Sequence, residues 1–174
     1  MSSVCACHKT EKCGWPARCG VGRWYTDRLL GAVCREDVLV KLSIGQQATR
    51  ELTVSKEMVR AYADITGDYN PLHFDEEFTA RTRFKRLLAQ GGITTGLLHA
   101  LVAMEMPGPG SVFVRQTWSF PRPVYIGDTI RAEATVKSVR ERRGMAELEF
   151  TVVNQDGATV LEGVATLFQV EPEG

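Results

Sequence analysis

The pattern of apolar residues changes at Gly110, and this change constrains the fold more than any other feature of the chain. Before it, the segment from Ile93 to Glu105 is apolar on nearly every side when drawn as a helix, which predicts a buried helix. After it, apolar and polar residues alternate, as they do in half-buried strands. The alternating segments are 111–120, 129–139, 146–153 and 159–170.

A buried helix followed by consecutive antiparallel strands predicts an α+β fold. In this fold, an antiparallel curved sheet wraps around one long buried helix, an arrangement called the hot-dog fold. Upstream, residues 47–54 predict a further strand, and Lys56 to about Thr66 predicts a short helix capped by Ser55. We therefore expect one domain over residues 38–172.

Residues 1–37 differ from this domain, because they lack apolar periodicity and hold all five cysteines. We expect a disordered N-terminal tail, or a gene model that begins too early. A zinc site is an alternative, although structural zinc ligands usually come in two close pairs. A mitochondrial presequence is another alternative. Such presequences are basic and amphipathic, and this segment is basic but not amphipathic. The candidate zinc ligands are Cys5, Cys7, Cys13, Cys19 and His8.

The overall charge excludes some classes of partner. Lysine plus arginine and aspartate plus glutamate each number 21, so the formal net charge is zero. A neutral chain offers no global attraction to nucleic acid or to an anionic membrane. No stretch approaches the roughly 20 apolar residues of a transmembrane helix. The cysteine-free body fits a reducing cytosol, so we expect a cytoplasmic protein with no nucleic-acid or membrane partner.

The strongest chemical candidates are Asp68 and His73, which lie five residues apart across a Gly-Asp-Tyr-Asn-Pro turn. A carboxylate and an imidazole aimed at one water can act as an acid–base pair, because histidine titrates near neutral pH. The alternative is that Asp68 and Asn70 only cap backbone amides in the turn. On composition alone, this second interpretation is favoured.

Gly91 and Gly92 open the predicted buried helix. The first N–H groups of a helix have no partner within it, and that end of the helix is electropositive. A glycine there lets a ligand oxygen approach the backbone, so the site can stabilise an oxyanion. Close packing of helix against sheet is an equally good explanation of the two glycines.

The segment from Tyr62 to His73 resembles the signature of the MaoC-like (R)-specific enoyl-CoA hydratases and 3-hydroxyacyl thioester dehydratases. It contains an aromatic residue, a small residue and then Gly-Asp-Tyr-Asn-Pro-Leu-His. The resemblance continues through Gln90-Gly91 and Gly127-Asp128 and covers roughly Leu42 to Val170. It implies a hot-dog domain that reversibly hydrates trans-2-enoyl thioesters to (R)-3-hydroxyacyl thioesters.

The resemblance also implies roles for individual residues. Asp68 and His73 would be the catalytic pair, and the backbone N–H of Gly91 would bind the oxyanion. Asn70 and Gln90 would support them. Many family members have His-Gly where this chain has Gln90-Gly91, which leaves the effect of the glutamine side chain on the pocket open.

The resemblance further implies a homodimer that needs no metal and no cofactor. The acyl group would arrive as a thioester of coenzyme A or of acyl carrier protein, and the latter would then be a partner. Two alternatives remain: a hot-dog acyl-CoA thioesterase, and a non-catalytic thioester-binding partner subunit.

Overall fold

The computed structural model describes residues 42–170. The cysteine-rich tail, with its possible zinc ligands, and the expected domain limits at 38 and 172 lie outside the described residues. They stay predictions.

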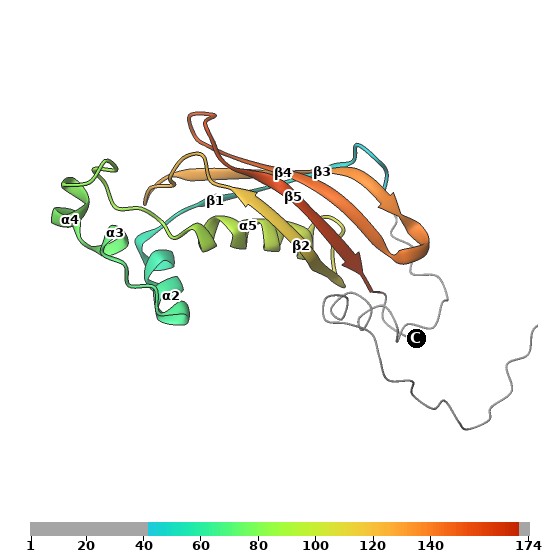
Figure 1. Cartoon of the computed structure of the whole chain (residues 1–174), viewed down its shortest axis with the longest axis horizontal. Helices are drawn as coiled ribbons and strands as arrows, with labels where there is room; N and C mark the ends of the chain where they lie inside the picture. The colour runs from blue at the N-terminus through green and yellow to red at the C-terminus, as the bar shows by residue number, and fades with distance from the viewer. Residues whose placement is uncertain (1–41, 171–174) are drawn as a thin grey trace, which may run out of the picture. The chain divides into compact units, whose positions relative to one another are not determined.

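Five antiparallel strands form one sheet in the order β1-β3-β4-β5-β2 (Figure 1). The helix α5, Gly91–Met104, lies along one face of this sheet. The predicted α+β fold, a curved antiparallel sheet around one long helix, is confirmed. The strands are β1 Gln47–Thr53, β2 Ser111–Ser119, β3 Thr129–Arg140, β4 Met145–Asn154 and β5 Thr159–Gln169.

The core lies between the sheet and α5. Alternate residues of β3 and β4 point toward the helix, as the period of a strand requires. Leu98 and Leu101 of α5 and Phe150 of β4 are completely buried there. Burial of apolar surface on this scale is the main force that holds the sheet and helix together.

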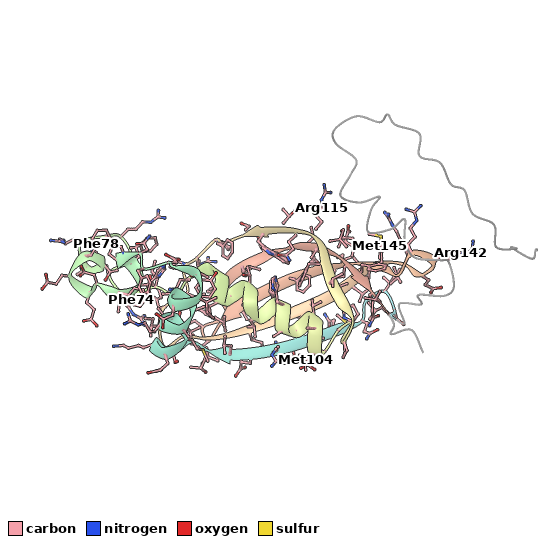
Figure 2. All side chains as sticks on the ribbon, turned by 90° about the horizontal axis from the view of Figure 1, so that it is seen from below. Phe74, Phe78, Met104, Arg115, Arg142 and Met145 are labelled. Atoms are coloured by element: carbon pink, nitrogen blue, oxygen red, sulfur yellow. The ribbon has the colours of Figure 1, made fainter. Side chains whose placement is uncertain are left out.

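The helix α5 is less buried than its sequence predicts. Leu98 and Leu101 face the sheet, but Gly96, His99 and Met104 are exposed, Met104 by 64% (Figure 2). The described chain therefore covers only one side of a helix whose residues are mostly apolar. The prediction of burial on all sides is wrong for a single copy of this chain.

Strand β2 departs from simple alternation. Its pairing with β5 shifts between Phe113 and Arg115. As a result, Phe113 and Trp118 both pack against the core, whereas Val112 and Val114 are 49% and 39% exposed. A one-residue shift sends the following side chains to the opposite face of a sheet, and the sequence pattern did not reveal it.

Three short helices precede α5 and carry the predicted signature. Side chains of Ser55, Asn70 and Asp75 accept hydrogen bonds from backbone N–H groups in the first turns, at 3.3, 3.0 and 2.8 Å respectively. These caps satisfy donors that a helix leaves free. Gly67, at φ 77°, ends the first helix in the left-handed conformation that glycine adopts easily. The helices are α2 Lys56–Thr66, α3 Pro71–Phe74 and α4 Glu76–Ala80.

Candidate active site

The turn between α2 and α3 brings Asp68 and His73 together. Asp68 Oδ2 lies 3.7 Å from His73 Nε2. The histidine side chain is 10% exposed and the aspartate side chain 43% exposed. The pair thus has a fixed inner member and an outer member that water and ligands can reach.

The other ring nitrogen of His73 is held by the backbone. His73 Nδ1 lies 2.8 Å from the carbonyl oxygen of Leu88. Because a carbonyl can only accept, Nδ1 carries the hydrogen of this bond. In the neutral ring, Nε2 is then an acceptor that faces a second acceptor, the Asp68 carboxylate.

Asn70 shapes the turn that carries the pair. Its side chain caps α3, and its backbone N–H lies 3.4 Å from Asp68 Oδ1. Pro71 follows at the first helical position, where its fixed φ and missing N–H cost nothing. The capping interpretation and the acid–base interpretation are therefore compatible, because the same turn caps α3 and brings the two candidate side chains together.

Gln90 links this turn to the neighbouring helices. It is 2% exposed and directly precedes α5. Its side-chain N–H₂ donates to the carbonyl of Val59 at 3.1 Å and to that of Asp68 at 3.5 Å. Its Oε1 is buried and has no partner among the described residues. A buried polar atom without a hydrogen-bond partner lowers the stability of the fold, so its presence indicates a functional role for this position.

The first turn of α5 packs closely against two aromatic residues. Gly91 is exposed, and a Cβ built on it would lie 3.4 Å from the Phe120 ring. A Cβ on Gly92 would overlap the hydroxyl of Tyr62. Sequence reasoning placed neither neighbour against the two glycines, although Tyr62 is the aromatic residue that opens the signature.

Within the part of the chain that the structure describes, no side chain caps the start of α5. Ile93 N–H donates to the carbonyl of Gln90 at 3.0 Å, whereas the N–H groups of Gly91 and Gly92 have no hydrogen-bond acceptor there and can bind a ligand oxygen. The helix dipole favours negative charge at this end. Both proposed explanations of the paired glycines hold in part, since Gly92 is required for packing and Gly91 leaves the backbone open.

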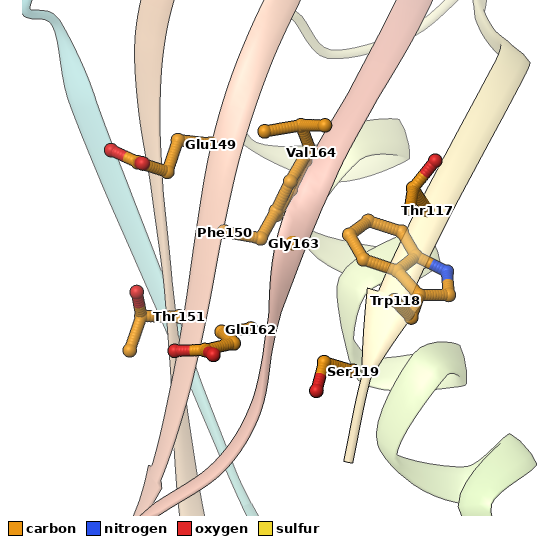
Figure 3. Close-up of a pocket in the computed structure, with 9 residues that line it drawn as sticks. All are labelled: Thr117, Trp118, Ser119, Glu149, Phe150, Thr151, Glu162, Gly163 and Val164. Atoms are coloured by element: carbon orange, nitrogen blue, oxygen red, sulfur yellow. The ribbon is translucent and has the colours of Figure 1, made fainter. Parts of the chain in front are cut away.

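A cavity of about 350 Å³ lies among β2, β4 and β5 (Figure 3). Trp118, Glu149 and Val164 are among its lining residues. Neither Asp68, His73 nor Gly91 lines it. This cavity therefore does not belong to the candidate active site.

His99 lies on the exposed side of α5, away from the signature. Its ring stacks on Phe113 with centroids 4.7 Å apart, and its Nε2 accepts a hydrogen bond from Gln116 at 3.3 Å. These contacts indicate a packing role for His99.

Among residues 42–170, no group of three or more His, Cys, Asp or Glu side chains could hold a metal ion. No helix in the same range is long and apolar enough to span a membrane.

The curved sheet, the long helix along it and the aspartate–histidine turn between α2 and α3 define a hot-dog domain with a candidate acid–base site. Residues 41–158 match the family model described as "MaoC like domain". The chain belongs to this family.

Three relatives illustrate the range of the family. The chain is 35% identical over 126 residues to an (R)-specific enoyl-CoA hydratase of Aeromonas caviae, covering 72% of this chain and 94% of the relative. It is 38% identical over 124 residues to a 3-hydroxybutyryl-CoA dehydratase of Methylorubrum extorquens, covering 71% and 78%. It is 35% identical over 127 residues to a mitochondrial 3-hydroxyacyl-(acyl-carrier-protein) dehydratase of Solanum lycopersicum, covering 72% and 76%.

Solved structures of R-hydratases are also similar to this chain. The (R)-hydratase of A. caviae superposes with a TM-score of 0.72 at 34% identity, covering 75% of this chain and 98% of that structure. The R-hydratase of Pseudomonas aeruginosa superposes with a TM-score of 0.71 at 30% identity, covering 79% and 93%. The ChsH1–ChsH2 complex of Mycobacterium tuberculosis, at 19% identity and a TM-score of 0.65, covers 74% of this chain and 98% of that structure and shares the fold alone.

Proposed function

We propose that this protein reversibly hydrates trans-2-enoyl thioesters to (R)-3-hydroxyacyl thioesters. The observation that carries the proposal is the approach of Asp68 and His73, which lie 3.7 Å apart across the turn between α2 and α3. Relatives named as hydratases and dehydratases, at 35% and 38% identity, support the reaction class.

The pair is suited to hold one water molecule. A separation of 3.7 Å is too long for a direct hydrogen bond between Asp68 and His73. A water between two acceptors can donate one hydrogen to each and keep a lone pair for attack. In the hydration direction, this oxygen forms a bond to C3 and loses a proton to the pair, which returns a proton to C2. Dehydration is the reverse.

The electron pair of the C2–C3 double bond moves toward the thioester oxygen as the C3–O bond forms. The backbone N–H of Gly91 stabilises the resulting enolate, because it is a preorganised donor at the positive end of α5. One such donor typically contributes about 3 kcal/mol. Asn70 and Gln90 act on Asp68 through the turn, so we assign them positioning roles.

The test is the loss of conjugated absorbance when purified protein is mixed with crotonyl-CoA. We expect Asp68→Asn and His73→Gln each to reduce the rate by about 10²–10⁴-fold, since each removes one general acid–base group. Asp156→Asn is the matched control, because Asp156 is an exposed carboxylate in the turn between β4 and β5, outside the pair and its turn. Full activity in either pair variant, or equal loss in the control, would remove the proposed mechanism.

The rival functions give different signals in the same assay. A thioesterase releases free thiol from saturated acyl-CoA, and a non-catalytic subunit binds thioester without turnover. The reaction we propose needs no metal or cofactor, since the charge develops on the thioester itself. A series of enoyl chain lengths defines the substrate once hydration is observed.

We also propose that two copies form a homodimer through β2 and the exposed side of α5. In the described chain β2 pairs only with β5, and Val112 and Val114 are exposed nearby. An unpaired strand edge with apolar neighbours is typical of an interface. Sedimentation should give twice the chain mass, and Val114→Glu should lower it; a monomeric wild-type protein would contradict the proposal.

We propose that the protein resides in the cytoplasm. The tomato relative is named mitochondrial, which supports mitochondria as the alternative. Imaging of the full chain fused at its C-terminus separates the two.

A further inference from the structure

The hydroxyl of Tyr62 lies at the start of α5, beside the two glycines of the candidate site. Tyr62 belongs to α2, and Figure 1 shows this helix next to the end of α5 at which that helix begins. A Cβ built on Gly92 would meet the hydroxyl oxygen of Tyr62 before any other atom of the ring. The phenol oxygen therefore occupies space that only a glycine leaves at this position.

The Tyr62 hydroxyl has no hydrogen-bond partner within residues 42–170. The backbone carbonyl of Tyr62 accepts from the Thr66 hydroxyl at 2.7 Å, but the phenol takes no part in that contact. The phenol oxygen is also not one of the two buried side-chain atoms without a partner, which are Gln90 Oε1 and Ser111 Oγ. Because Tyr62 is only partly buried, its hydroxyl reaches space that a ligand can occupy. A phenol can donate one hydrogen, so this donor is available to a ligand.

A single buried amide holds the phenol, the start of α5 and the aspartate turn in a fixed relation. Gln90 directly precedes α5 and donates to the carbonyl of Val59, three residues before Tyr62 on α2, at 3.1 Å. The same side-chain N–H₂ lies 3.5 Å from the carbonyl of Asp68. Donors that are fixed in this way stabilise developing charge well, because they do not have to reorient during the reaction.

The first turn of α5 therefore offers two kinds of donor to one ligand oxygen. The N–H groups of Gly91 and Gly92 have no acceptor within the described chain, and the Tyr62 hydroxyl lies against the same turn. A carbonyl oxygen has two lone pairs, so it can accept from a backbone N–H and from a hydroxyl at the same time. The ring alone would be sufficient if Tyr62 served only to pack α2 against α5.

We propose that Tyr62 is a second oxyanion donor, whose hydroxyl donates a hydrogen bond to the thioester oxygen that the Gly91 N–H also binds. The inference rests on the proposed function, which places a thioester at the start of α5. As the C3–O bond forms, the electron pair of the double bond moves toward the thioester oxygen. The phenol keeps its proton, and its hydrogen bond becomes stronger as the charge on that oxygen grows. Tyr62 is then a catalytic residue in addition to Asp68 and His73.

The kinetic test is Tyr62→Phe, which removes the oxygen and keeps the ring. We expect kcat for crotonyl-CoA to fall about 10²-fold with KM nearly unchanged, because an oxyanion donor acts on the transition state. Stability in urea should be unchanged, since the hydroxyl has no partner in the described chain. The matched control is Tyr125→Phe, a partly buried tyrosine whose hydroxyl donates to the carbonyl of Phe84 at 3.3 Å, and it should retain kcat.

Two results of this test would overturn the proposal. The first is a wild-type kcat in Tyr62→Phe. The second is a fall in kcat that is matched by a loss of stability, which would assign Tyr62 to packing.

A spectroscopic measurement separates this inference from the proposed function, because it requires no turnover. Acetoacetyl-CoA loses a proton from C2 to give an enolate that absorbs in the near ultraviolet, and donors at the thioester oxygen favour this form. At fixed pH, we expect the wild-type chain and Tyr125→Phe to increase the enolate absorbance, and Tyr62→Phe to increase it less. Dependence on Tyr62 without hydration of crotonyl-CoA would contradict the proposed function and support the donor role. Equal absorbance with wild type and Tyr62→Phe would overturn the donor role, whether or not crotonyl-CoA is hydrated.

Discussion

The sheet with α5 and the segment from α2 to α4 are stabilised in different ways. In the first region, side chains such as Leu101 and Phe150 are completely buried. Between residues 55 and 80, the buried residues are Val59, Ala63, His73 and Thr79. Three helix caps and a few side-chain hydrogen bonds hold that segment instead.

Because of this difference, the residues that stabilise the fold and the residues proposed for catalysis lie mostly in different regions. A core defined by apolar burial tolerates little change in volume, whereas a capped turn depends on individual donors and acceptors. The proposed catalytic pair lies in the second region, where Asp68 stays accessible to ligand. Substitutions in the two regions should therefore affect different measurements.

The largest effect on stability is expected in the core. Phe150→Ala should lower the free energy of unfolding by about 3–5 kcal/mol, because it removes a large ring and leaves a cavity. Urea unfolding measures the loss, and crotonyl-CoA hydration per folded molecule should be retained. If the variant does not fold, Phe150→Leu provides a milder test. A loss below 1 kcal/mol for the alanine variant would contradict the packing described here.

The next effect concerns the contact between the two regions. Gly92→Ala should cost about 1–3 kcal/mol and reduce hydration, because the added methyl overlaps Tyr62 on α2. Gly96→Ala is the matched control, since nothing in the same chain lies within 4 Å of its added Cβ. Both variants are measured in the Val114→Glu background, because Gly96 lies on the side of α5 that we propose as the dimer interface. In the single chain, alanine there should stabilise the helix by about 0.5–1 kcal/mol. Equal behaviour of the two variants in urea unfolding would refute the proposed contact.

A smaller effect compares two helix caps. Asn70→Ala and Ser55→Ala should each cost about 1 kcal/mol, because each leaves a backbone N–H without its acceptor. Only Asn70→Ala should also lower kcat, since this cap positions α3 and with it His73. Paired unfolding and kinetic measurements check the distinction. Comparable kcat losses in both variants would mean that the caps act only through stability.

The smallest effect is expected at Tyr69, which is 52% exposed. Its hydroxyl donates to Asp64 at 2.5 Å, and this hydrogen bond raises the pKa of Tyr69 above its ordinary value of 10.0. The folded state then holds the proton more tightly than the unfolded state does. The contribution to stability is present below pH 10 and is lost as the pH rises through the folded pKa.

Tyr69→Phe should therefore lower the free energy of unfolding slightly at pH 7, where the hydrogen bond is intact, and the difference from wild type should shrink as the pH rises through the folded pKa of Tyr69. An alkaline absorbance titration that compares wild type with the variant isolates the Tyr69 transition. A transition at or below that of free tyrosine would show that the hydrogen bond to Asp64 does not persist in solution.

Local features were determined by the sequence alone. The predicted helix from Lys56 to about Thr66 matches α2, and Ser55 and Asn70 cap their helices as expected. These features depend on residues within about four positions of one another, so their physical causes are visible in the sequence. The turn that joins Asp68 to His73 belongs to this class.

Only the tertiary structure decided the contacts made across long separations. His73 is oriented by Leu88, 15 residues away, and Gln90 reaches the carbonyl of Val59, 31 residues away. The register shift in β2 and the exposed side of α5 could not be predicted from the sequence either. Such contacts depend on how whole elements pack and on which strand lies beside which, and no periodicity within a single segment encodes that choice.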